Sequence, residues 1–452
     1  MQAFREHLEH PVGRGLTEGH RGVAGGALCG DYVSVGVRVE GTRVVDVGWE
    51  ASGCGATLAA CSAVASLADA EVLDAARISV AAVSAELGGL SVGKLHAAEL
   101  AVDAFHSALG AAVRATAALK EADERVAVAM SGGVDSAVAA LLVGGDCFGV
   151  TVELWRDPDN DSEASCCSAS AVRAARSVAH GLGMPHFTLD LRDEFRAGVV
   201  DPWLADHAAG LTPNPCVRCN GHVRLDAMLA FADRLGARTL ATGHYARVQD
   251  GRLRAGADPA KDQAYMLAAT SPETLARLRF PLGDLSKPQV RALAADAGLP
   301  VAGKAESQDL CFLAGTGHAA FLAKHGAPDA PGEIVRDGVL VGRHDGQQGF
   351  TVGQRRGIRV AAEEPLYVLA KHDSTVVVGA REQLAVREVD VRDLVLRGEP
   401  DAVRLRYHAK PVPCSVVDST LVLGEPFSGA APGQVAVLYA GDVVVGHATI
   451  CE

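Results

Sequence analysis

The stretch from Arg125 to Val143, RVAVAMSGGVDSAVAALLV, constrains the fold more than any other part of this chain. Val126 to Met130 is an unbroken apolar run of a length typical of a strand buried on both faces, and Ser136 to Val143 is rich in alanine and leucine, which favour helix. The two glycines between them let the backbone turn tightly and approach a ligand. A helix N-terminus carries partial positive charge and unpaired N–H groups, so this unit predicts a site for a phosphate chain.

The loop SGGVDS is not a Walker A sequence, because GxxxxGK[ST] is absent and no lysine follows the glycines. It resembles the pyrophosphate loop (PP-loop) of enzymes that split ATP into AMP and pyrophosphate to adenylate an oxygen atom. The resemblance implies that Asp135 holds Mg²⁺ against the leaving pyrophosphate. A glycine-rich turn without a ligand is the alternative interpretation. The residues that the resemblance places around ATP in this segment are Ala129, Met130, Ser131, Gly132, Gly133, Val134, Asp135 and Ser136.

Composition and charge limit the class of protein. A chain of 452 residues is long enough for about three domains, and 48% hydrophobic with 21% charged residues is typical of a globular protein. The formal net charge of −13 offers no global attraction for nucleic acid, so an RNA partner would have to meet a local basic face. The N-terminal sequence MQAFREHLEH lacks the apolar core of a signal peptide, and no apolar run reaches membrane length. We therefore expect a cytoplasmic protein with no membrane partner; the sequence gives no oligomeric state.

The eleven cysteines are consistent with a reducing compartment. There they are expected to be thiols, metal ligands or redox nucleophiles instead of structural disulfides.

The first 120 residues combine a predicted hairpin, two predicted helices and a set of metal-type ligands. Apolar and polar residues alternate over 33–39 and 43–47, which predicts a hairpin, and apolar residues recur at three and four spacing over about 56–68 and 94–112, which predicts helices. Two thiolates, a carboxylate and an imidazole from separate elements suit iron or zinc. These ligands are Cys29, Asp31, Cys54 and His96.

This region resembles the iron–sulfur cluster assembly scaffolds of the IscU/NifU type over nearly its whole length. In that pattern Cys29, Asp31, Cys54 and His96 match the cluster-binding positions. The chain departs from the pattern at Ala97, where the family has a third cysteine directly after the histidine. Cys61, about two turns beyond Cys54, could substitute only if its helix turns it inward. Two interpretations stay open: a working cluster or metal site, and a degenerate scaffold kept for docking or folding.

The charged segment EADER, Glu121 to Arg125, predicts a domain boundary, after which strands and helices alternate. Strands are expected over 148–154, 186–191 and 238–242, and helices over about 169–182 and 224–235. This alternation predicts a doubly wound parallel sheet of the α/β class, with ligands bound beyond the carboxyl ends of the strands.

The segment TPNPCVRCN, Thr212 to Asn220, contains a CxxC pair. Its prolines and asparagines argue against helix and sheet, so we expect Cys216 and Cys219 on a rigid turn that faces one direction. A CxxC pair alone serves zinc knuckles, redox pairs and clusters, and no second CxxC follows to complete a four-cysteine zinc site. Cys311, in KAESQDLCF, is the thiol that we expect opposite this pair.

Seven motifs occur in the order and spacing of the tRNA-specific 2-thiouridylases, the MnmA family of bacteria. The resemblance runs from about Arg125 to the C-terminus. It implies ATP-dependent adenylation of the C2 oxygen of the wobble uridine (position 34) and its replacement by sulfur, giving 2-thiouridine, AMP and pyrophosphate. It also implies tRNA of the Glu, Gln or Lys type as substrate, and a sulfur donor such as a cysteine desulfurase or inorganic sulfide. The motifs are SGGVDS, TPNPCVRCN, ATGHYAR, KDQAYML, FPLGDLSKPQVR, KAESQDLCF and FTVGQRRG.

The family's functional positions carry over residue by residue. Cys219 matches the nucleophile and Cys311 the cysteine that bears a persulfide, while Val152 and Gly243 match ATP contacts. Many relatives have Asp where this chain has Cys216. The positions that match tRNA contacts are Asn214, Pro215, Cys216, His244, Lys261, Asp262, Gln263, Arg406, Tyr407 and Gln434.

Two chemistries compete for the thiols. In one, a persulfide on Cys311 delivers its terminal sulfur to the adenylated C2 atom and Cys219 then forms a disulfide with Cys311. In the other, Cys216, Cys219 and Cys311 hold three irons of a [4Fe-4S] cluster whose fourth iron carries the transferable sulfide. We favour the cluster, because Cys216 has a role only there and because the scaffold-like region points to iron–sulfur supply.

From Gly332 onward, short alternating runs separated by glycine and aspartate predict small β-rich domains, which the resemblance extends to a terminal β-barrel. GQRRGIR places Arg355 and Arg356 on a glycine turn, which is suited to phosphate contacts. In VRLRY, alternation predicts that Arg404 and Arg406 share one face of a strand. Tyr407 could equally be a core residue.

The chain is therefore divided into four expected domains: an IscU/NifU-like α+β domain at 1–120, a PP-loop (N-type ATP pyrophosphatase) domain at 125–315, a central tRNA-binding domain at 316–382 and a C-terminal β-barrel at 383–452. Two alternatives to the thiolase remain. One is another PP-loop ligase, such as an amide or guanidino synthase, which would not need the cysteine set. The other is a non-catalytic iron–sulfur scaffold or carrier, against which Ala97 argues.

Overall fold

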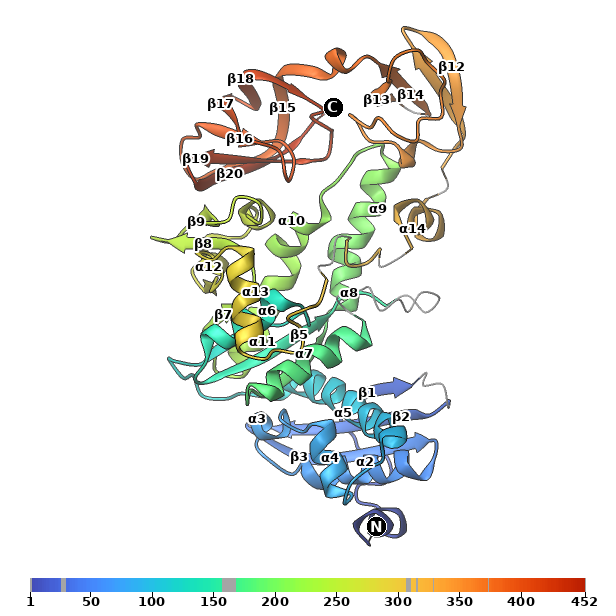
Figure 1. The fold of residues 1–452 in the computed structure, drawn as a ribbon, viewed down its shortest axis with the longest axis vertical. Helices are drawn as coiled ribbons and strands as arrows, with labels where there is room; N and C mark the ends of the chain where they lie inside the picture. Colours follow the sequence, from blue (N-terminus) through green and yellow to red (C-terminus); the bar gives the residue numbers. More distant parts are fainter. Residues whose placement is uncertain are drawn as a thin grey trace. The chain divides into compact units, whose positions relative to one another are not determined.

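The computed structural model describes residues 2–25, 30–156, 168–305, 310–313, 316–327, 329–372 and 374–451. The chain divides into two compact units, each assembled from separate segments (Figure 1). Unit 1 comprises Met1–Arg192, Asp226–His244 and Arg277–Gln308. Unit 2 comprises Asp193–Leu225, Tyr245–Ala276 and Asp309–Glu452. Cys29, one of the expected metal ligands, lies outside the described residues.

The N-terminal part of unit 1 is a three-stranded antiparallel sheet covered by helices. Its strands are β1 (His20–Gly25), β2 (Tyr32–Glu40) and β3 (Arg43–Ser52), in that order. The predicted hairpin is confirmed, since β2 and β3 pair with Glu40 opposite Arg43. Both predicted helices are confirmed as well, and β1 was not foreseen. The helices are α1 (Gln2–Glu9), α2 (Gly55–Leu67), α3 (Val72–Ala75), α4 (Val80–Glu86) and α5 (Leu95–Thr116), with a 3₁₀ turn at Val92–Lys94.

The second part of unit 1 is a five-stranded sheet whose pairs are all parallel, in the order β10-β7-β4-β5-β6. The apolar run that ends in the SGGVDS loop forms the central strand, with Val126, Ala127 and Val128 at most 3% exposed. The expected doubly wound α/β fold is thus confirmed. The strands are β4 (Val126–Ala129), β5 (Cys147–Glu153), β6 (His186–Asp190), β7 (Thr239–Ala241) and β10 (Leu278–Arg279). The helices are α6 (Val134–Val143), α7 (Ala169–Gly181), α11 (Leu225–Arg234) and α13 (Lys287–Asp296).

Unit 2 contains two β structures. A four-stranded sheet has the order β12-β11-β14-β13, and a closed six-stranded barrel has the order β15-β18-β17-β16-β19-β20, with β20 pairing back to β15. The barrel encloses fully buried residues such as Val403, Leu421 and Leu438. The expected β-rich C-terminal domains and terminal barrel are confirmed. The first sheet consists of β11 (Gly332–Arg336), β12 (Val339–His344), β13 (Tyr367–His372) and β14 (Thr375–Gly379). The barrel consists of β15 (Ala385–Leu396), β16 (Ala402–Arg404), β17 (Val412–Val417), β18 (Thr420–Ser428), β19 (Val435–Ala440) and β20 (Val443–Ile450).

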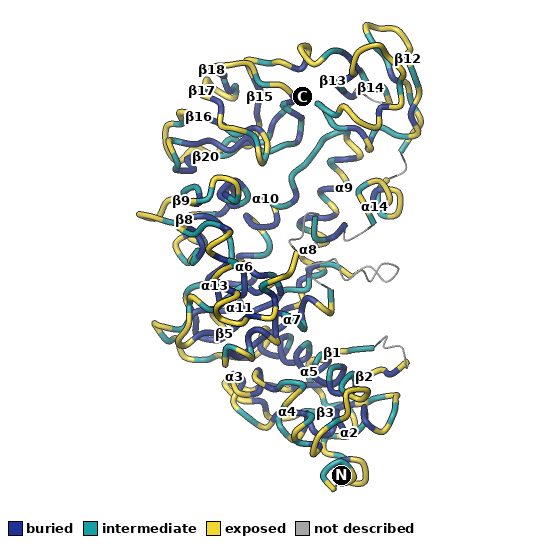
Figure 2. The backbone as a smooth tube through the Cα atoms, in the orientation of Figure 1, coloured by how far each residue is buried: buried dark blue, intermediate teal, exposed yellow. Residues whose placement is uncertain are grey.

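The remaining elements of unit 2 are a β-hairpin and several short helices. The hairpin β8 (Ala246–Gln249) and β9 (Arg252–Ala255) extends the barrel sheet beyond β20. In both units buried residues, dark blue in Figure 2, gather in the strands and in the helices that cover them. None of the helices in the described ranges has the length and apolar character needed to cross a membrane. The other helices are α8 (Arg192–Phe195), α9 (Asp201–Ala208), α10 (Pro215–Cys219), α12 (Pro272–Leu275) and α14 (His318–His325), with a π segment at Asn220–Arg224.

Two local predictions were wrong. The CxxC segment forms the short helix α10 instead of a non-helical turn, because Pro215 occupies a first-turn position where its missing N–H costs nothing and Asn214 caps the helix. The strand predicted through VRLRY ends at Arg404. Arg404 forms an ion pair with Asp262 at 2.7 Å, while Arg406 lies beyond the strand and is exposed. The two arginines do not share a strand face.

Candidate functional site

The SGGVDS loop of unit 1 is ordered by its two serines. The Ser131 backbone N–H donates to Oγ of Ser136 over 3.1 Å, and the two hydroxyl oxygens lie 3.2 Å apart. The Ser136 hydroxyl also donates to the carbonyl oxygen of Gly133. These bonds fold the loop over the N-terminus of α6, where the first N–H groups of the helix have no partner within the helix. The predicted phosphate-binding segment thus has the strand–loop–helix form that its chemistry needs.

Two glycines are required where other backbone meets this loop. Gly132 has φ +68°, and a Cβ there would lie 2.5 Å from the carbonyl oxygen of Ala171 at the start of α7. Gly243, which follows β7, packs against the first turn of α6, because a Cβ there would lie 2.8 Å from the backbone N of Ser136. The structure therefore brings the predicted ATP contact Gly243 to the predicted loop. Val152 stands near the carboxyl end of the neighbouring strand β5.

Two lysines that the sequence analysis did not assign to ATP converge on the loop. Lys287, at the start of α13, places Nζ 2.8 Å from each carboxylate oxygen of Asp135, and Lys287 is 8% exposed. Lys304 donates from Nζ to the carbonyl oxygen of Gly132 over 2.9 Å. The signal in the sequence was the Ser-Lys-Pro of the motif FPLGDLSKPQVR, a pattern typical of a helix start, but the 152-residue separation hid the partner of the lysine. The site thus combines one carboxylate, two hydroxyls and two ammonium groups.

His244, a predicted tRNA contact, follows Gly243 in unit 1. Its Nδ1 lies 2.7 Å from the hydroxyl oxygen of Thr242, and its ring meets Phe280 edge-on at 6.2 Å. These contacts orient the ring beside the nucleotide loop.

The cysteine pair lies in unit 2 on α10. The side-chain oxygen of Asn214 accepts hydrogen bonds from the backbone N–H groups of Cys216 (3.1 Å) and Val217 (3.3 Å). Because residues three apart on a helix share a face, Cys216 and Cys219 are placed on the same side of this turn. Cys216 is half-buried and Cys219 is 8% exposed, and both are reduced.

The barrel of unit 2 holds the chain just before α10. Thr212 donates its backbone N–H to the carbonyl oxygen of Pro432 over 2.8 Å, and the Gln434 side chain donates to the carbonyl oxygen of Thr212 over 2.6 Å. The Tyr265 hydroxyl donates to the carbonyl oxygen of Val435 over 2.6 Å. Gln434 was expected to contact tRNA, and its described contact positions the cysteine-bearing segment.

Cys311, also in unit 2 and reduced, is anchored through its neighbour Phe312. Phe312 is 3% exposed and packs against Trp203 and Phe321, with ring centroids 5.2 and 5.1 Å away. Trp203 in turn stacks edge-on with His207 at 4.3 Å. This cluster fixes the backbone next to the predicted sulfur-bearing thiol.

Of the three consecutive residues predicted to contact tRNA, Lys261, Asp262 and Gln263, the last two bind the protein backbone through their side chains, which accept backbone N–H groups. Lys261 is partly exposed. The Asp262 carboxylate is buried, accepting N–H groups of Gly256 and Ala264 and the Arg404 guanidinium at 2.7 Å. The Gln263 side chain accepts the N–H of Tyr245. Asp262 and Gln263 therefore shape the loop that presents Lys261.

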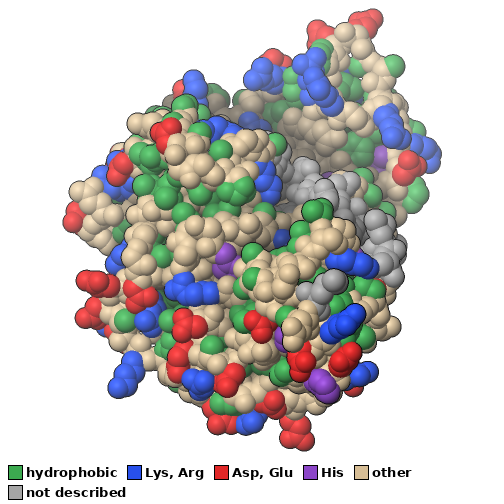
Figure 3. Space-filling model, turned by 60° about the horizontal axis from the view of Figure 1, so that its bottom comes forward, with side chains coloured by type: hydrophobic (Ala, Val, Ile, Leu, Met, Phe, Trp, Pro, Cys, Tyr) green, Lys and Arg blue, Asp and Glu red, His purple; other side chains and the backbone are tan. Residues whose placement is uncertain are grey.

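The remaining predicted tRNA contacts are accessible in different degrees. Arg355, Arg356 and Arg406 are exposed. Tyr407 is half-buried against Tyr265, with ring centroids 5.7 Å apart, and burial next to the Asp262 carboxylate raises the pKa of its hydroxyl. On the face that Figure 3 presents, acidic and basic side chains are interspersed, in keeping with the acidic total.

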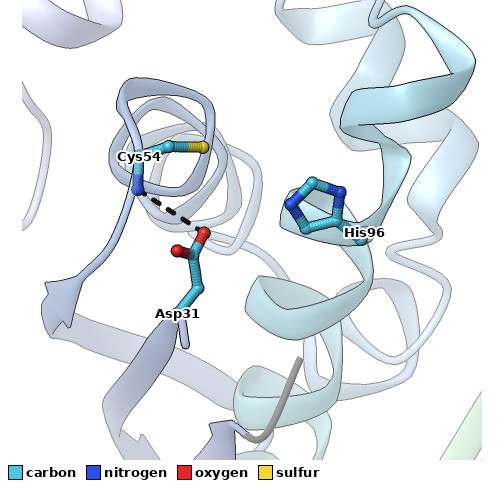
Figure 4. A group of neighbouring side chains, drawn as sticks. All are labelled: Asp31, Cys54 and His96. Carbon is cyan, nitrogen blue, oxygen red and sulfur yellow. Dashed lines mark hydrogen bonds between the residues drawn. The ribbon is translucent and has the colours of Figure 1, made fainter. Parts of the chain in front are cut away.

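The N-terminal part of unit 1 brings three predicted ligands together. The ligand atoms of Asp31, Cys54 and His96 all lie within 4.8 Å of one another, and their side chains converge in Figure 4. Asp31 directly precedes β2, Cys54 directly precedes α2, and His96 lies in the first turn of α5. Among the described residues, Nε2 of His96 is buried and has no hydrogen-bond partner. An orphaned imidazole nitrogen beside a thiol and a carboxylate fits a zinc or iron ion.

Hydrogen bonds at this site favour the thiolate form of Cys54 more than in an ordinary cysteine. Burial opposes ionisation of Cys54, yet hydrogen bonds from Thr57 and from the backbone of Ala56 outweigh it and lower the pKa of the thiol. Nζ of Lys94 lies 3.6 Å from the sulfur. Cys61 does not substitute for the cysteine that is missing at Ala97, because it is 1% exposed within α2 and burial raises the pKa of its thiol to about 12.

Comparisons with known protein families assign all of these parts. Residues 2–117 match a family model described as the NifU-like N-terminal domain, and residues 124–315 match the tRNA methyl transferase HUP domain. Residues 319–380 match the tRNA methyl transferase PRC-barrel domain, and residues 399–450 the aminomethyltransferase β-barrel domain.

Curated relatives match over most or all of the chain. A bifunctional NifU/MnmA protein of Rubrobacter xylanophilus is 44% identical over 481 residues, covering 99% of this chain and 97% of that protein. A tRNA-specific 2-thiouridylase MnmA of Methylorubrum extorquens is 44% identical, covering 73% of this chain and 94% of its own. Another from Rhizorhabdus wittichii is 45% identical, covering 72% and 91%.

Proposed function

The chain belongs to the MnmA family of tRNA-specific 2-thiouridylases and carries a NifU-like N-terminal domain, and on this premise we propose how it thiolates tRNA. ATP adenylates the C2 oxygen of the wobble uridine (position 34), and sulfur then replaces that oxygen. The products are 2-thiouridine, AMP and pyrophosphate. The family resemblance favours tRNA of the Glu, Gln or Lys type.

The nucleotide half of the reaction is assigned to unit 1. Ser131 to Ser136 and the N-terminus of α6 would cradle the phosphates, while Gly243 closes one side. The carboxylate of Asp135 and the two serine hydroxyls are oxygen ligands of the kind that Mg²⁺ takes. When bound, Mg²⁺ would neutralise charge on the departing pyrophosphate. Lys287 and Lys304 add positive charge at the same place, which stabilises the transition state. The convergence of both lysines on the loop is the observation that carries this assignment.

The sulfur half is assigned to Cys216, Cys219 and Cys311 of unit 2. In the persulfide route the terminal sulfur of the Cys311 persulfide bonds to C2 and AMP leaves. The Cys219 thiolate then attacks the sulfur of Cys311, breaking the S–S bond so that sulfur stays on the base and a Cys219–Cys311 disulfide forms, which a thiol must reduce before the next turnover.

In the cluster route these three cysteines would hold a [4Fe-4S] centre that supplies the sulfide when bound. Cys216 and Cys219 share one face of α10, which favours joint use as ligands. The donor would be inorganic sulfide or a cysteine desulfurase. We favour this route because the persulfide route leaves Cys216 without a role.

The N-terminal domain is proposed to bind iron or zinc through Asp31, Cys54 and His96 as a second function of the chain. The convergence of the three ligands and the orphaned Nε2 of His96 support this assignment. With Ala97 in place of a cysteine, the described residues give three ligands and leave a coordination position for a further group.

One experiment separates the two sulfur routes. Full-length protein is prepared anaerobically and incubated with tRNA, ATP and Mg²⁺, in one sample with sulfide and in another with a cysteine desulfurase and cysteine, because sulfide alone cannot form the Cys311 persulfide without an oxidant. The tRNA nucleosides are then analysed by mass spectrometry. We expect 2-thiouridine with the parent protein. Cys216→Ala should abolish it in the cluster route and preserve it in the persulfide route, and bound iron is measured on the same samples. Cys414→Ala, on barrel strand β17, is the matched control. Absence of 2-thiouridine with every sulfur source would contradict the proposed function.

A further inference from the structure

The edge strand of the parallel sheet in unit 1 is covered by the N-terminal domain. β6 is the last strand in the order β10-β7-β4-β5-β6, so one side of its backbone has no neighbouring strand in the part of the chain that the structure describes. Helix α5 occupies that side, lying between the N-terminal sheet and the parallel sheet in Figure 1 and buried over much of its length in Figure 2. An uncovered strand edge presents unpaired N–H and C=O groups and tends to associate.

The contact between α5 and β6 follows a common repeat. His106 places Nδ1 3.1 Å from the carbonyl oxygen of His186. Gly110 lies against Thr188, since a Cβ there would be 1.8 Å from its carbonyl oxygen. Arg114 donates from Nη1 to the carbonyl oxygen of Asp190 over 3.1 Å. Every fourth residue of the helix thus meets every second residue of the strand.

Helix and strand geometry explain why this repeat holds over three steps. Four helical residues rise about 6 Å and two strand residues about 6.6 Å. The alternate strand residues 186, 188 and 190 are those whose carbonyl groups point away from β5. One outward backbone N–H of the strand also has a partner, because His186 donates to the carbonyl oxygen of Ala76 over 3.0 Å. Within the described residues of unit 1, α5 takes the place of a sixth strand.

The same face of α5 also contacts helix α7, which packs against the SGGVDS loop. Asp103, three residues before His106, accepts Nε of Arg173 at 2.6 Å and Nη1 of Arg176 at 2.7 Å. Side-chain exposure is 16% for Asp103 and 7% for Arg176, so this ion pair is largely shielded from water. Both arginines belong to α7, whose carbonyl of Ala171 backs Gly132 of the SGGVDS loop.

We propose that the N-terminal domain is a fixed part of the ATP domain, docked through His106, Gly110 and Arg114, and that Asp103 is a positioning residue for the nucleotide loop. The domain works in place on its own chain instead of as a detachable carrier. The role of Asp103 in positioning the nucleotide loop rests on the proposed ATP site, whereas the docking of the N-terminal domain does not.

Docking is tested with two helical glycines in the full-length protein. Alanine normally stabilises a helix relative to glycine, because glycine loses more backbone freedom when it becomes helical. Gly181→Ala, in α7 with open space around its Cβ position, should therefore raise the thermal midpoint or leave it unchanged. Gly110→Ala should lower it and speed amide exchange at His186, because α5 must move off β6. Equal behaviour of the two variants would overturn the docking.

Positioning is tested with Asp103→Asn against Asp69→Asn, which alters an exposed ion pair with Arg43 in the same domain. We expect Asp103→Asn to raise the KM for ATP about five- to tenfold while kcat stays within about twofold, with Asp103→Glu restoring part of the loss. Equilibrium binding of ATP–Mg²⁺ should weaken by the same factor. An unchanged affinity in Asp103→Asn would overturn the positioning. If the parent protein binds no ATP, the proposed function fails, and the Gly110 comparison still decides the docking.

Discussion

At the scale of single residues, the site contains an ion pair between Lys287 and Asp135 that is held at short distance. Lys287 holds both carboxylate oxygens of Asp135 and is almost fully buried. A buried ammonium group is costly without such a partner, so the pair stabilises both residues in place. Because Asp135 is also the proposed Mg²⁺ ligand, Lys287 stands where charge on pyrophosphate would develop.

We predict that Lys287→Met lowers kcat/KM for ATP-dependent tRNA thiolation by about 10²-fold, because a positioned cation is lost from the transition state. Pyrophosphate release and 2-thiouridine formation measure the effect. Lys120→Met removes an exposed lysine of the same unit and is expected to change neither rate. Equal rates for Lys287→Met and the parent protein would contradict the assigned role.

His207 gives unit 2 a defined pH dependence. Burial, together with the nearby His318 and Lys371, lowers the pKa of His207 from 6.5 to about 3. Between these values the unfolded chain binds a proton that the folded protein does not bind. The free energy of unfolding therefore rises with pH between about 3 and 6.5. As the pH falls below about 6.5, the folded protein becomes progressively less stable.

We predict that His207→Gln reduces this slope by about 1.4 kcal/mol per pH unit between pH 4 and 6. Urea unfolding at a series of pH values provides the measurement. His372→Gln removes an exposed histidine of the same unit and should leave the slope unchanged. A slope that survives in His207→Gln would assign the pH dependence to other groups.

At the scale of elements, the barrel turn Pro432–Gln434 determines where the cysteine helix α10 begins. Gly433 has φ +88°, and a Cβ there would come within 2.9 Å of the Thr212 backbone N. The turn can therefore approach the chain before α10 only with glycine at this position. Gln434 adds a side-chain hydrogen bond to the same residue.

We predict that Gly433→Ala displaces the start of α10 and increases the alkylation rate of Cys219, which is 8% exposed in the folded protein. A left-handed conformation costs a residue with a Cβ about 1–2 kcal/mol, so some stability is lost in any case. Gly441→Ala is the matched control, because it has φ +60° in the same barrel with open space at its Cβ position. Gly441→Ala should cause the same backbone strain but leave the alkylation rate of Cys219 unchanged. Similar alkylation rates in both variants would exclude a role of this turn in placing Cys219.

At the scale of the whole molecule, the two halves of the proposed reaction are assigned to different units. The SGGVDS loop, Lys287 and Gly243 belong to unit 1, and Cys216, Cys219 and Cys311 belong to unit 2. Activation of tRNA and transfer of sulfur should therefore be separable by substitution.

We predict that Cys219→Ser still releases up to about one pyrophosphate per tRNA but forms no 2-thiouridine, because adenylation needs only the nucleotide site. Asp135→Asn should neither release pyrophosphate nor form 2-thiouridine. Pyrophosphate assay and nucleoside mass spectrometry on the same samples give the two readouts. Loss of pyrophosphate release in Cys219→Ser would show that the cysteine is required before activation.

The sequence by itself determined the alternation of strands and helices from β4 to β7 in the parallel sheet of unit 1, the strand–loop–helix form of SGGVDS and the family, because hydrophobic period, glycine position and contiguous motifs are local properties of the chain. It also located Asp31, Cys54 and His96, which the fold does bring together. It failed at α10, where one proline and one cap residue favoured a helix over the expected turn.

Only the tertiary structure decided the pairing of Lys287 with Asp135, the seating of α10 on a barrel turn 222 residues away from Thr212, and the burial of Asp262 and Arg404. The same holds for α5 as the cover of β6. Contacts between distant segments leave no periodic trace in either segment, because each depends on where the other is packed.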